Sequence, residues 1–355
     1  MLLYVVSAIF VLGILIIVHE WGHFWMARKM GVGVEKFSIG FGRPMWQKKI
    51  GETEFIVAWI PFGGYVKMVG DEEGEDAPVP ENPEISFNSK AVWRRFLIVF
   101  AGPLANLIFA ALVFMLVYMI GIDVPDTKIK TVVAGSPAHG VGIISGDRIV
   151  EIDGKEISSW SELSEVIGQA PDKQLELTIQ PETGSIRYVS ITPEAQSSKT
   201  IFGEDIRVGR IGISPDTVFK RYDPFTAAYL GTKKMIEIIY LTGMVIVKMV
   251  QQIVPANTIG GPLMIFKIAG DQAQAGLIPL LMFMGVLSVN LGFLNLLPVP
   301  ILDGGHIMFF AIEAIKGGPV SLKGREIAQQ VGIFLLITLM AFAFYNDITR
   351  FMASE

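Results

Sequence analysis

Four long apolar segments are the main feature of the hydrophobic pattern along this chain. They cover roughly residues 2–26, 96–122, 277–302 and 329–346. A helix of about 20 apolar residues crosses the roughly 30 Å hydrocarbon core of a bilayer. We therefore predict a polytopic α-helical membrane protein with four transmembrane helices.

The first segment is uncharged from residue 2 to residue 18. A signal peptide would have a basic region before it and a small-residue cleavage site after it, and neither is evident. We therefore expect a retained first helix. The loop between the first two spans is rich in lysine and arginine, whereas none precedes the first span. By the positive-inside rule this loop is cytoplasmic and the N-terminus lies outside.

Within that loop, residues 54–68 predict two short strands around Pro61 and the Gly63-Gly64 pair. A hydrophobic hairpin beside a membrane is typical of a membrane-associated, re-entrant element that packs against protein. A plain cytoplasmic hairpin is the alternative. The acidic, proline-bearing run at 71–84 is expected to be a solvated linker.

Residues 124–195 are more polar and predict a small folded domain on the outer face. Ser159 and Glu162 form a capping-box pattern at the start of a helix. Strand-like runs are found at 128–133, 147–152, 174–180 and 186–192.

Segment 225–254 is largely apolar but contains several charged residues. We interpret it as an amphipathic helix on the outer membrane surface. The expected organisation therefore has four parts. They are a first membrane half (1–122), an extracytoplasmic domain with a linker (123–222), an amphipathic surface region (223–276) and a second membrane half (277–355).

Composition narrows the function classes. The chain has 355 residues, of which 51% are hydrophobic, and its mean hydropathy of +0.50 excludes an ordinary soluble protein. A net charge of −5 without an extended basic patch gives no electrostatic basis for binding nucleic acid. Because the chain has no cysteine, a metal would have to be held by His, Asp or Glu.

The sequence HEWGH places His19, Glu20 and His23 at the end of the first apolar segment. On a helix, the four-residue spacing puts both imidazoles on one face, where they can bind one Zn²⁺. The glutamate between them can then act as a general base on a water molecule. The alternative is an interfacial helix end whose histidines face lipid headgroups.

Asp303 is the candidate third ligand, because it follows Pro298 and Pro300 at the end of the third apolar run. A turn aspartate in the Asp-Gly-Gly sequence is the alternative, and His306 is a rival ligand. His139, in the outer domain, is expected to be a surface residue. For Asp303 to meet the two histidines, the first and third spans must run in the same direction, which excludes a further span at 225–254.

These motifs, in this order, make the chain resemble the site-two protease family of intramembrane zinc metalloproteases, in its bacterial regulator-of-sigma-E protease branch. The resemblance rests on HEWGH, GFGRPMW (40–46), AGPLAN (101–106) and NLGFLNLLPVPILDGGH (290–306). The outer domain resembles a bacterial PDZ domain at Ser136-Pro137-Ala138, Gly146-Asp147 and Asp153-Gly154. Well-known members of this branch carry two PDZ domains, whereas this chain has room for one.

The resemblance implies zinc bound by His19, His23 and Asp303, with Glu20 as the catalytic base. It implies a bacterial inner-membrane enzyme that cleaves single-span membrane proteins, such as anti-sigma factors, with HEWGH near the cytoplasmic side. Asn295 and Pro298 would hold the substrate, and an edge strand of the hairpin would pair with it. The residues predicted for this pairing are Phe55, Ile56, Val57, Ala58 and Tyr65.

Two other functions remain open from the sequence. One is a non-catalytic membrane scaffold whose PDZ-like domain binds a peptide ligand. The other is a zinc-dependent transporter, which would need polar residues spread through several spans. The second and fourth apolar segments carry no charge, which disfavours the transporter.

Overall fold

The computed structural model describes residues 1–71 and 82–353, with the side chains of residues 61 and 62 left out. Most of the predicted acidic linker at 71–84 therefore lies outside the described residues. The chain forms two compact units. The first comprises Met1–Val117, Asp223–Met244 and Ala256–Glu355, and the second comprises Tyr118–Tyr222 and Val245–Pro255.

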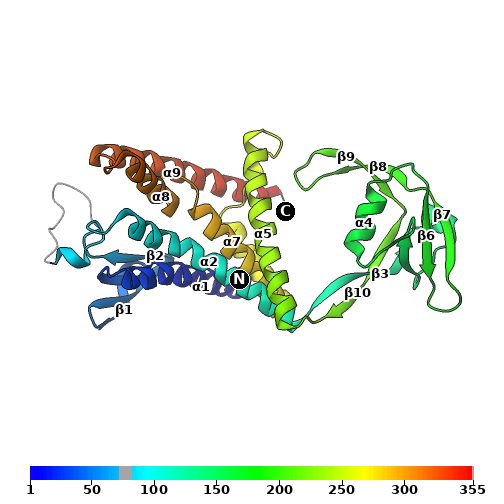
Figure 1. The fold of residues 1–355 in the computed structure, drawn as a ribbon, viewed down its shortest axis with the longest axis horizontal. Coiled ribbons are helices and arrows are strands. Elements are labelled where there is room, and N and C mark those ends of the chain that lie inside the picture. The colour runs from blue at the N-terminus through cyan, green and yellow to red at the C-terminus, as the bar shows by residue number, and fades with distance from the viewer. Residues whose placement is uncertain (72–81, 354–355) are drawn as a thin grey trace. The chain divides into compact units, whose positions relative to one another are not determined.

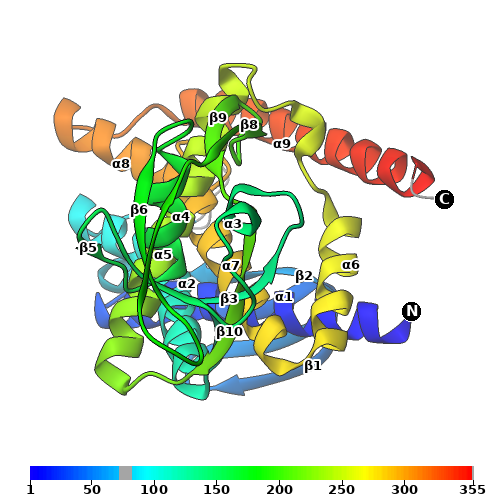
Figure 2. The same cartoon turned by 90° about the vertical axis from the view of Figure 1, so that its right-hand side faces the viewer.

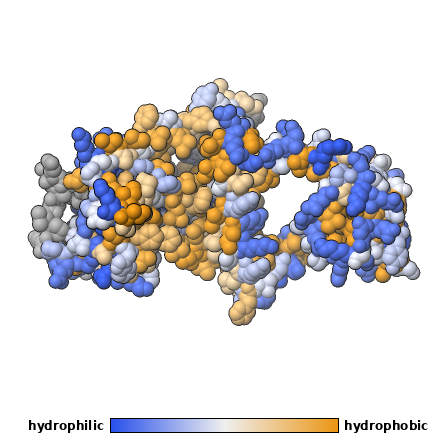
Figure 3. Space-filling view, turned by 45° about the horizontal axis from the view of Figure 1, so that its top comes forward, coloured by the Kyte–Doolittle hydropathy of each residue, from blue (hydrophilic) through white to orange (hydrophobic). Residues whose placement is uncertain are grey.

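Four helices among the described residues are long and apolar enough to cross a membrane. They are α1 (Leu2–Lys29), α2 (Val92–Ile120), α7 (Leu277–Asn295) and α9 (Leu322–Ala353). Hydrophobic side chains cover much of the visible surface of the unit that holds them, whereas the surface of the second unit is mostly hydrophilic (Figure 3). The predicted membrane protein is confirmed, although the third span ends at Asn295 rather than near residue 302.

Helix α2 runs antiparallel to both α1 and α7, so α1 and α7 run in the same direction. This is the arrangement that a shared site for HEWGH and Asp303 requires. Glycines let the helices approach closely, because a Cβ at Gly22 would lie 2.3 Å from the Ala101 carbonyl oxygen. Between α1 and α2, Gly22 contacts Ala101, and Val11 shares a hydrophobic cluster with Val113. Between α7 and α2, Gly292 contacts Pro103, and Gly285 contacts Phe114.

Helix α5 (Pro224–Val250) is not among the four candidate spans. Its first part runs across the direction of α1 and α2 (Figure 1). Gly231 lies against the backbone of Met115 in α2, and Thr242 Oγ1 lies 2.8 Å from Asn290 Oδ1 in α7. Its position on the membrane surface stays a prediction.

Two shorter helices were not predicted individually. Helix α6 (Pro262–Ala275) lies beside the start of α1 (Figure 2), where the Tyr4 hydroxyl donates to Asp271 Oδ1 at 2.9 Å. Helix α8 (Asp303–Lys316) follows α7 after a short loop. The 3₁₀ turns within the described residues are η1 (Pro83–Ile85) and η2 (Ala256–Thr258).

Strands β1 (Val34–Ile50) and β2 (Thr53–Met68) form the sheet of the first loop. The two predicted strands are both parts of the single strand β2, and they do not pair with each other. Residues 36–39 lie between them, pairing with 54–57 on one side and with 64–67 on the other. Residues 46–50 then pair with the outer side of 53–57. The predicted simple hairpin is therefore wrong, because a bent β1 separates its two halves.

The second unit is built on a sheet whose strand order is β10-β3-β4-β6-β7, with β5 beside β4. Its predicted strands and helix are confirmed, and Ser159 caps the helix by accepting from the Glu162 N–H at 3.3 Å. The strands β8, β9 and β10 were not predicted. The elements are β3 (Ile122–Val132), α3 (Pro137–Gly140), β4 (Arg148–Ile152), β5 (Lys155–Glu156), α4 (Trp160–Gly168), β6 (Leu175–Gln180), β7 (Arg187–Ile191), β8 (Glu194–Lys199), β9 (Asp205–Arg210) and β10 (Ile213–Lys220).

Candidate metal and active site

The HEWGH motif lies inside α1, where His19, Glu20 and His23 are all buried. The helical spacing places the two imidazoles one turn apart, with ring centroids 4.8 Å apart. His23 Nδ1 lies 2.9 Å from the Ile98 carbonyl oxygen of α2. A carbonyl oxygen can only accept a hydrogen bond, so Nδ1 of His23 carries the proton. The unprotonated Nε2 is then free to bind a metal through its lone pair.

The loop at 296–302 sets the position of Asp303. Helix α7 ends at Asn295, and α8 begins at Asp303, the first residue after the loop. The loop folds closely over the start of α8, because a Cβ at Gly304 would lie 2.2 Å from the Leu297 carbonyl oxygen. The Asp-Gly-Gly sequence therefore allows a tight turn that brings a carboxylate to the end of α7.

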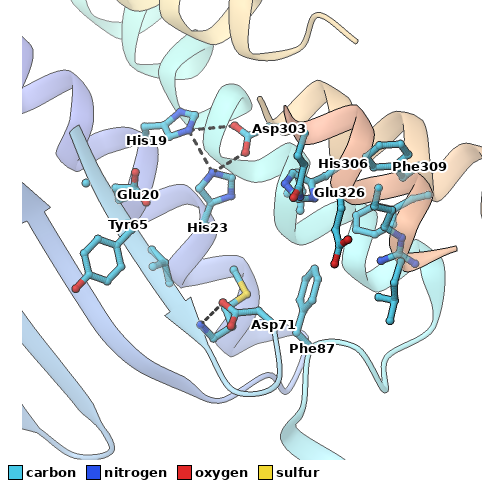
Figure 4. A pocket seen from close by; sticks show the side chains of 18 residues that line it. His19, Glu20, His23, Tyr65, Asp71, Phe87, Asp303, His306, Phe309 and Glu326 are labelled. Carbon is cyan, nitrogen blue, oxygen red and sulfur yellow. Dashed lines mark hydrogen bonds and ion pairs between the residues drawn. The ribbon is translucent and has the colours of Figure 1, made fainter. Parts of the chain in front are cut away.

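His19, His23 and Asp303 form a compact cluster of donor atoms (Figure 4). His19 Nε2 lies 3.1 Å from Asp303 Oδ2 and 3.2 Å from His23 Nε2, and His23 Nε2 lies 3.5 Å from Asp303 Oδ1. Zinc binds nitrogen and oxygen ligands at about 2.0–2.2 Å, so neighbouring ligands of a tetrahedral site are about 3.3 Å apart. With one ligand atom from each residue within 4.8 Å of the others, the cluster approximates three corners of a zinc site.

Gly102 of α2 leaves the space that His23 occupies. A Cβ at this position would lie 2.1 Å from His23 Nε2, far closer than a van der Waals contact with the imidazole ring. The glycine in the AGPLAN sequence is therefore needed for the geometry of the donor cluster.

A cavity of about 460 Å³ opens beside the cluster. Glu20 lines it together with the three donor residues, and Tyr65 lines it from the edge segment of β2 (Figure 4). Gly64 packs against the Glu20 side chain, since a Cβ added at Gly64 would lie 3.0 Å from Glu20 Cγ. The edge of the β1–β2 sheet thus runs directly past the HEWGH motif.

The other sequence-predicted residues divide into two groups. Asn295 reaches the cluster, with Nδ2 3.5 Å from His19 Nε2. His306 lines the cavity but is not part of the donor cluster found among the described residues. Pro298 is exposed in the loop, and His139 is exposed in the second unit as predicted.

The edge-strand prediction is wrong for Phe55, Ile56 and Val57. Each pairs with β1 residues on both sides, so no backbone edge is open to another strand. Ala58 is buried. None of these four residues lines the cavity, whereas the segment Gly64–Met68 does so at several positions.

Sequence reasoning missed Asn106 and the polar start of α9. Asn106 is fully buried, and its Nδ2 lies 3.2 Å from His19 Nδ1. An asparagine within an apolar span was the available signal, since buried polar groups in a membrane need a reason. Arg325, Glu326 and Gln329 also line the cavity, and nothing in the sequence pattern linked them to HEWGH.

Apolar helices around a buried His-Glu-x-x-His motif and a distant aspartate define the class of membrane-embedded metalloproteases. The comparisons with known proteins agree with this class. The sequence profile of peptidase family M50 matches residues 7–339. The chain therefore belongs to peptidase family M50, which confirms the resemblance to the site-two proteases.

Curated relatives support the same conclusion over nearly the whole chain. The chain is 33% identical over 449 residues to the regulator of sigma-E protease RseP of Escherichia coli (strain K12), covering 97% of this chain and 98% of the relative. It is 32% identical over 443 residues to the protease RseP of Yersinia pestis, covering 96% and 97%. It is 33% identical over 361 residues to a protein of Rhizobium meliloti (strain 1021) that carries the name of a zinc metalloprotease, covering 96% and 95%.

The family and these relatives establish a zinc metalloprotease of the RseP type that takes part in regulated intramembrane proteolysis. Together with the four apolar helices, they support an inner-membrane protein. The alignments with the two RseP proteins are longer than this chain of 355 residues, so these relatives contain a stretch that this chain lacks.

Proposed function

We propose that this metalloprotease cleaves the transmembrane segments of single-span membrane proteins. His19, His23 and Asp303 hold the zinc ion, and Glu20 acts as the general base. The observation that carries the proposal is the donor cluster itself. Two residues from α1 and one from the start of α8 meet at 3.1–3.5 Å beside a cavity that Glu20 also lines.

Bound zinc supplies Lewis acidity, which polarises a carbonyl oxygen and makes a water molecule more acidic. Glu20 is buried beside the two histidines and lines the same cavity as the three donor residues. It can therefore take a proton from the attacking water and deliver it to the leaving amine. Asn295 lies beside His19 and is placed to donate a hydrogen bond to an unwound substrate backbone.

A transmembrane helix hides its peptide bonds in its own hydrogen bonds, so the substrate must unwind before it is cut. The segment Gly64–Met68 supports a role in this step, because it pairs with 34–39 on one side only, among the described strands. An unwound substrate can add to its open edge as a further strand. Tyr65, which is 37% exposed, lies on this segment and is one of the residues that line the cavity.

The natural substrates belong to the same proposal. One relative is named for regulating sigma-E, so membrane-anchored anti-sigma factors are the proposed substrate class. The second unit, proposed as an extracytoplasmic PDZ-like domain, has a groove of about 690 Å³. Trp160, Leu163 and Ile167 of α4 line one side of this groove, which supports binding of a peptide.

The test is cleavage of a single-span model substrate by the full chain in detergent. Wild type should cleave it, whereas Glu20→Gln, or wild type with a chelator present, should not. Equal cleavage in all three conditions would reject the proposal. No cleavage in any of the three conditions would instead favour a membrane scaffold, whose behaviour does not depend on Glu20.

A further inference from the structure

Asn106 of α2 faces the side of His19 that is turned away from the donor cluster. His19 Nε2 is directed at Asp303 and His23, and Asn106 Nδ2 lies 3.2 Å from the other ring nitrogen, Nδ1. Asn106 has no exposed surface. Ser288 of α7 donates a hydrogen bond to its backbone carbonyl at 2.8 Å, which fixes this part of α2 between α1 and α7.

The chemistry of the ring decides what Asn106 must do. A histidine that binds a metal through Nε2 carries its proton on Nδ1, and that N–H needs an acceptor. For His23 the acceptor is the Ile98 carbonyl oxygen. Asn106 is the residue placed to serve the same purpose for His19.

The amide of Asn106 can present either of its ends to His19. Rotation by 180° exchanges Oδ1 and Nδ2 with almost no change in shape. Oδ1 is the one buried side-chain oxygen or nitrogen among the described residues that has no hydrogen-bond partner. With Nδ2 toward the ring, His19 Nδ1 must accept and Nε2 must carry the proton, which prevents metal binding. With Oδ1 toward the ring, Nδ1–H donates and Nε2 is free.

We propose that Asn106 is a positioning residue for the metal centre: its Oδ1 accepts from His19 Nδ1–H and so holds His19 in the tautomer that binds zinc through Nε2. The inference rests on the proposed role of His19 as a zinc ligand. Loss of an outer partner of a metal-binding histidine typically costs about 10–100-fold in metal affinity. Asn106 would therefore act on zinc affinity without touching the zinc.

The test is the zinc dissociation constant of the full chain in detergent, measured by competition with a chelator. Asn106→Leu keeps the size but removes the acceptor, and we expect affinity to fall about 10–100-fold. Asn106→Asp keeps an acceptor, and we expect affinity equal to that of wild type or tighter. A role in packing alone predicts the opposite order, because a carboxylate at a fully buried site is more disruptive than leucine.

Two controls separate the possible failures. Ser288→Ala removes the hydrogen bond to the Asn106 backbone but leaves the acceptor, so zinc affinity should stay within about threefold of wild type, well short of the loss expected for an outer partner. His19→Ala should abolish tight binding. If His19→Ala has no effect, the proposed ligand set is wrong. If His19→Ala weakens binding and Asn106→Leu does not, only the inference about Asn106 is overturned.

A second measurement covers the case in which Asn106→Leu does not fold. The chain has four histidines, so ¹⁵N-histidine labelling gives a simple spectrum. In zinc-loaded wild type, the Nδ1–H proton of His19 should be shifted downfield and protected from exchange with water. The same signal should persist in Asn106→Asp. An unprotected His19 Nδ1–H in wild type would overturn the inference.

Discussion

Replacing Gly102 with alanine tests the packing of the donor cluster. The new Cβ would lie 2.1 Å from His23 Nε2, whereas an ordinary contact begins at 3.4 Å. The imidazole must therefore retreat by about 1.3 Å, the difference between these distances. Zinc–ligand distances in genuine sites vary by only about 0.2 Å. His23 would thus be lost as a ligand, and its hydrogen bond to the Ile98 carbonyl would be lost with it.

The expected result is a fall in zinc affinity of more than about 100-fold, beyond the range for an outer-shell change. The substitution also affects the folding stability of the metal-free chain. Helix propensity favours it, because alanine stabilises a helix interior by about 1 kcal/mol relative to glycine. The clash itself costs about 1–3 kcal/mol, which this gain partly offsets, so the thermal stability of the metal-free chain should fall only modestly. Zinc affinity is measured by chelator competition, and stability by thermal unfolding in detergent.

Gly13→Ala is the matched control. Gly13 also lies in a candidate span, α1, but a Cβ there meets no other atom within 4 Å. This variant should keep the zinc affinity of wild type. Equal zinc affinity in Gly102→Ala and Gly13→Ala would show that His23 does not need the space that Gly102 provides.

Two further predictions concern charged pairs away from the donor cluster. Arg95, 8% exposed at its side chain, pairs with Glu313 of α8 at 2.6 Å. Glu313→Gln leaves a buried cation unpaired and should destabilise the chain by about 3 kcal/mol in thermal unfolding. The Glu313→Leu, Arg95→Leu double variant removes both charges and should be more stable than Glu313→Gln. A double variant that is no more stable would contradict this prediction. In the second unit, the hydrogen bond from Arg148 holds the pKa of Asp126 below its usual value. Because the folded-state pKa is depressed, the pair stabilises the unit above about pH 4 and loses its effect as the pH falls through the folded pKa. Asp126→Asn should therefore speed hydrogen exchange in β3 and β4 at pH 7 but not near pH 2, and an equal effect at both pH values would reject the assignment.

Part of the site could be predicted from two kinds of sequence feature. One is the local spacing of residues on a helix, and the other is a polar group in an apolar segment, where it is energetically costly. The spacing of His19 and His23 alone places them on one helix face. Asp303 was predictable because a carboxylate beside a broken apolar segment needs a partner. These two signals together also required α1 and α7 to run in the same direction, as the structure shows.

The β1–β2 sheet could not be predicted because its pairing is not local. The sequence around Gly63-Gly64 indicates a break between two strands, and neighbouring strands usually pair with each other. Here β1 bends at Gly40 and Gly42, whose φ values are +89° and +90°, and its first half enters between the two parts of β2. A glycine shows that a bend is allowed but not which strand will fill the space.

The contact between Asn106 and His19 was hidden for a related reason. The two residues are 87 positions apart and meet only through the packing of α1 against α2. Likewise, Arg325 reaches the cavity only because α9 borders it. Helix packing of this kind depends on the complete set of helix contacts, which the local hydrophobic pattern does not contain.

The zinc content of purified chains tests most directly whether ligands about 280 positions apart in the sequence form one metal centre. Wild type, Glu20→Gln and His306→Ala should each hold one zinc per chain. Asp303→Ala should hold almost none after dialysis against a mild chelator. Undiminished zinc in Asp303→Ala, or loss of zinc in His306→Ala instead, would show that Asp303 is not the third ligand.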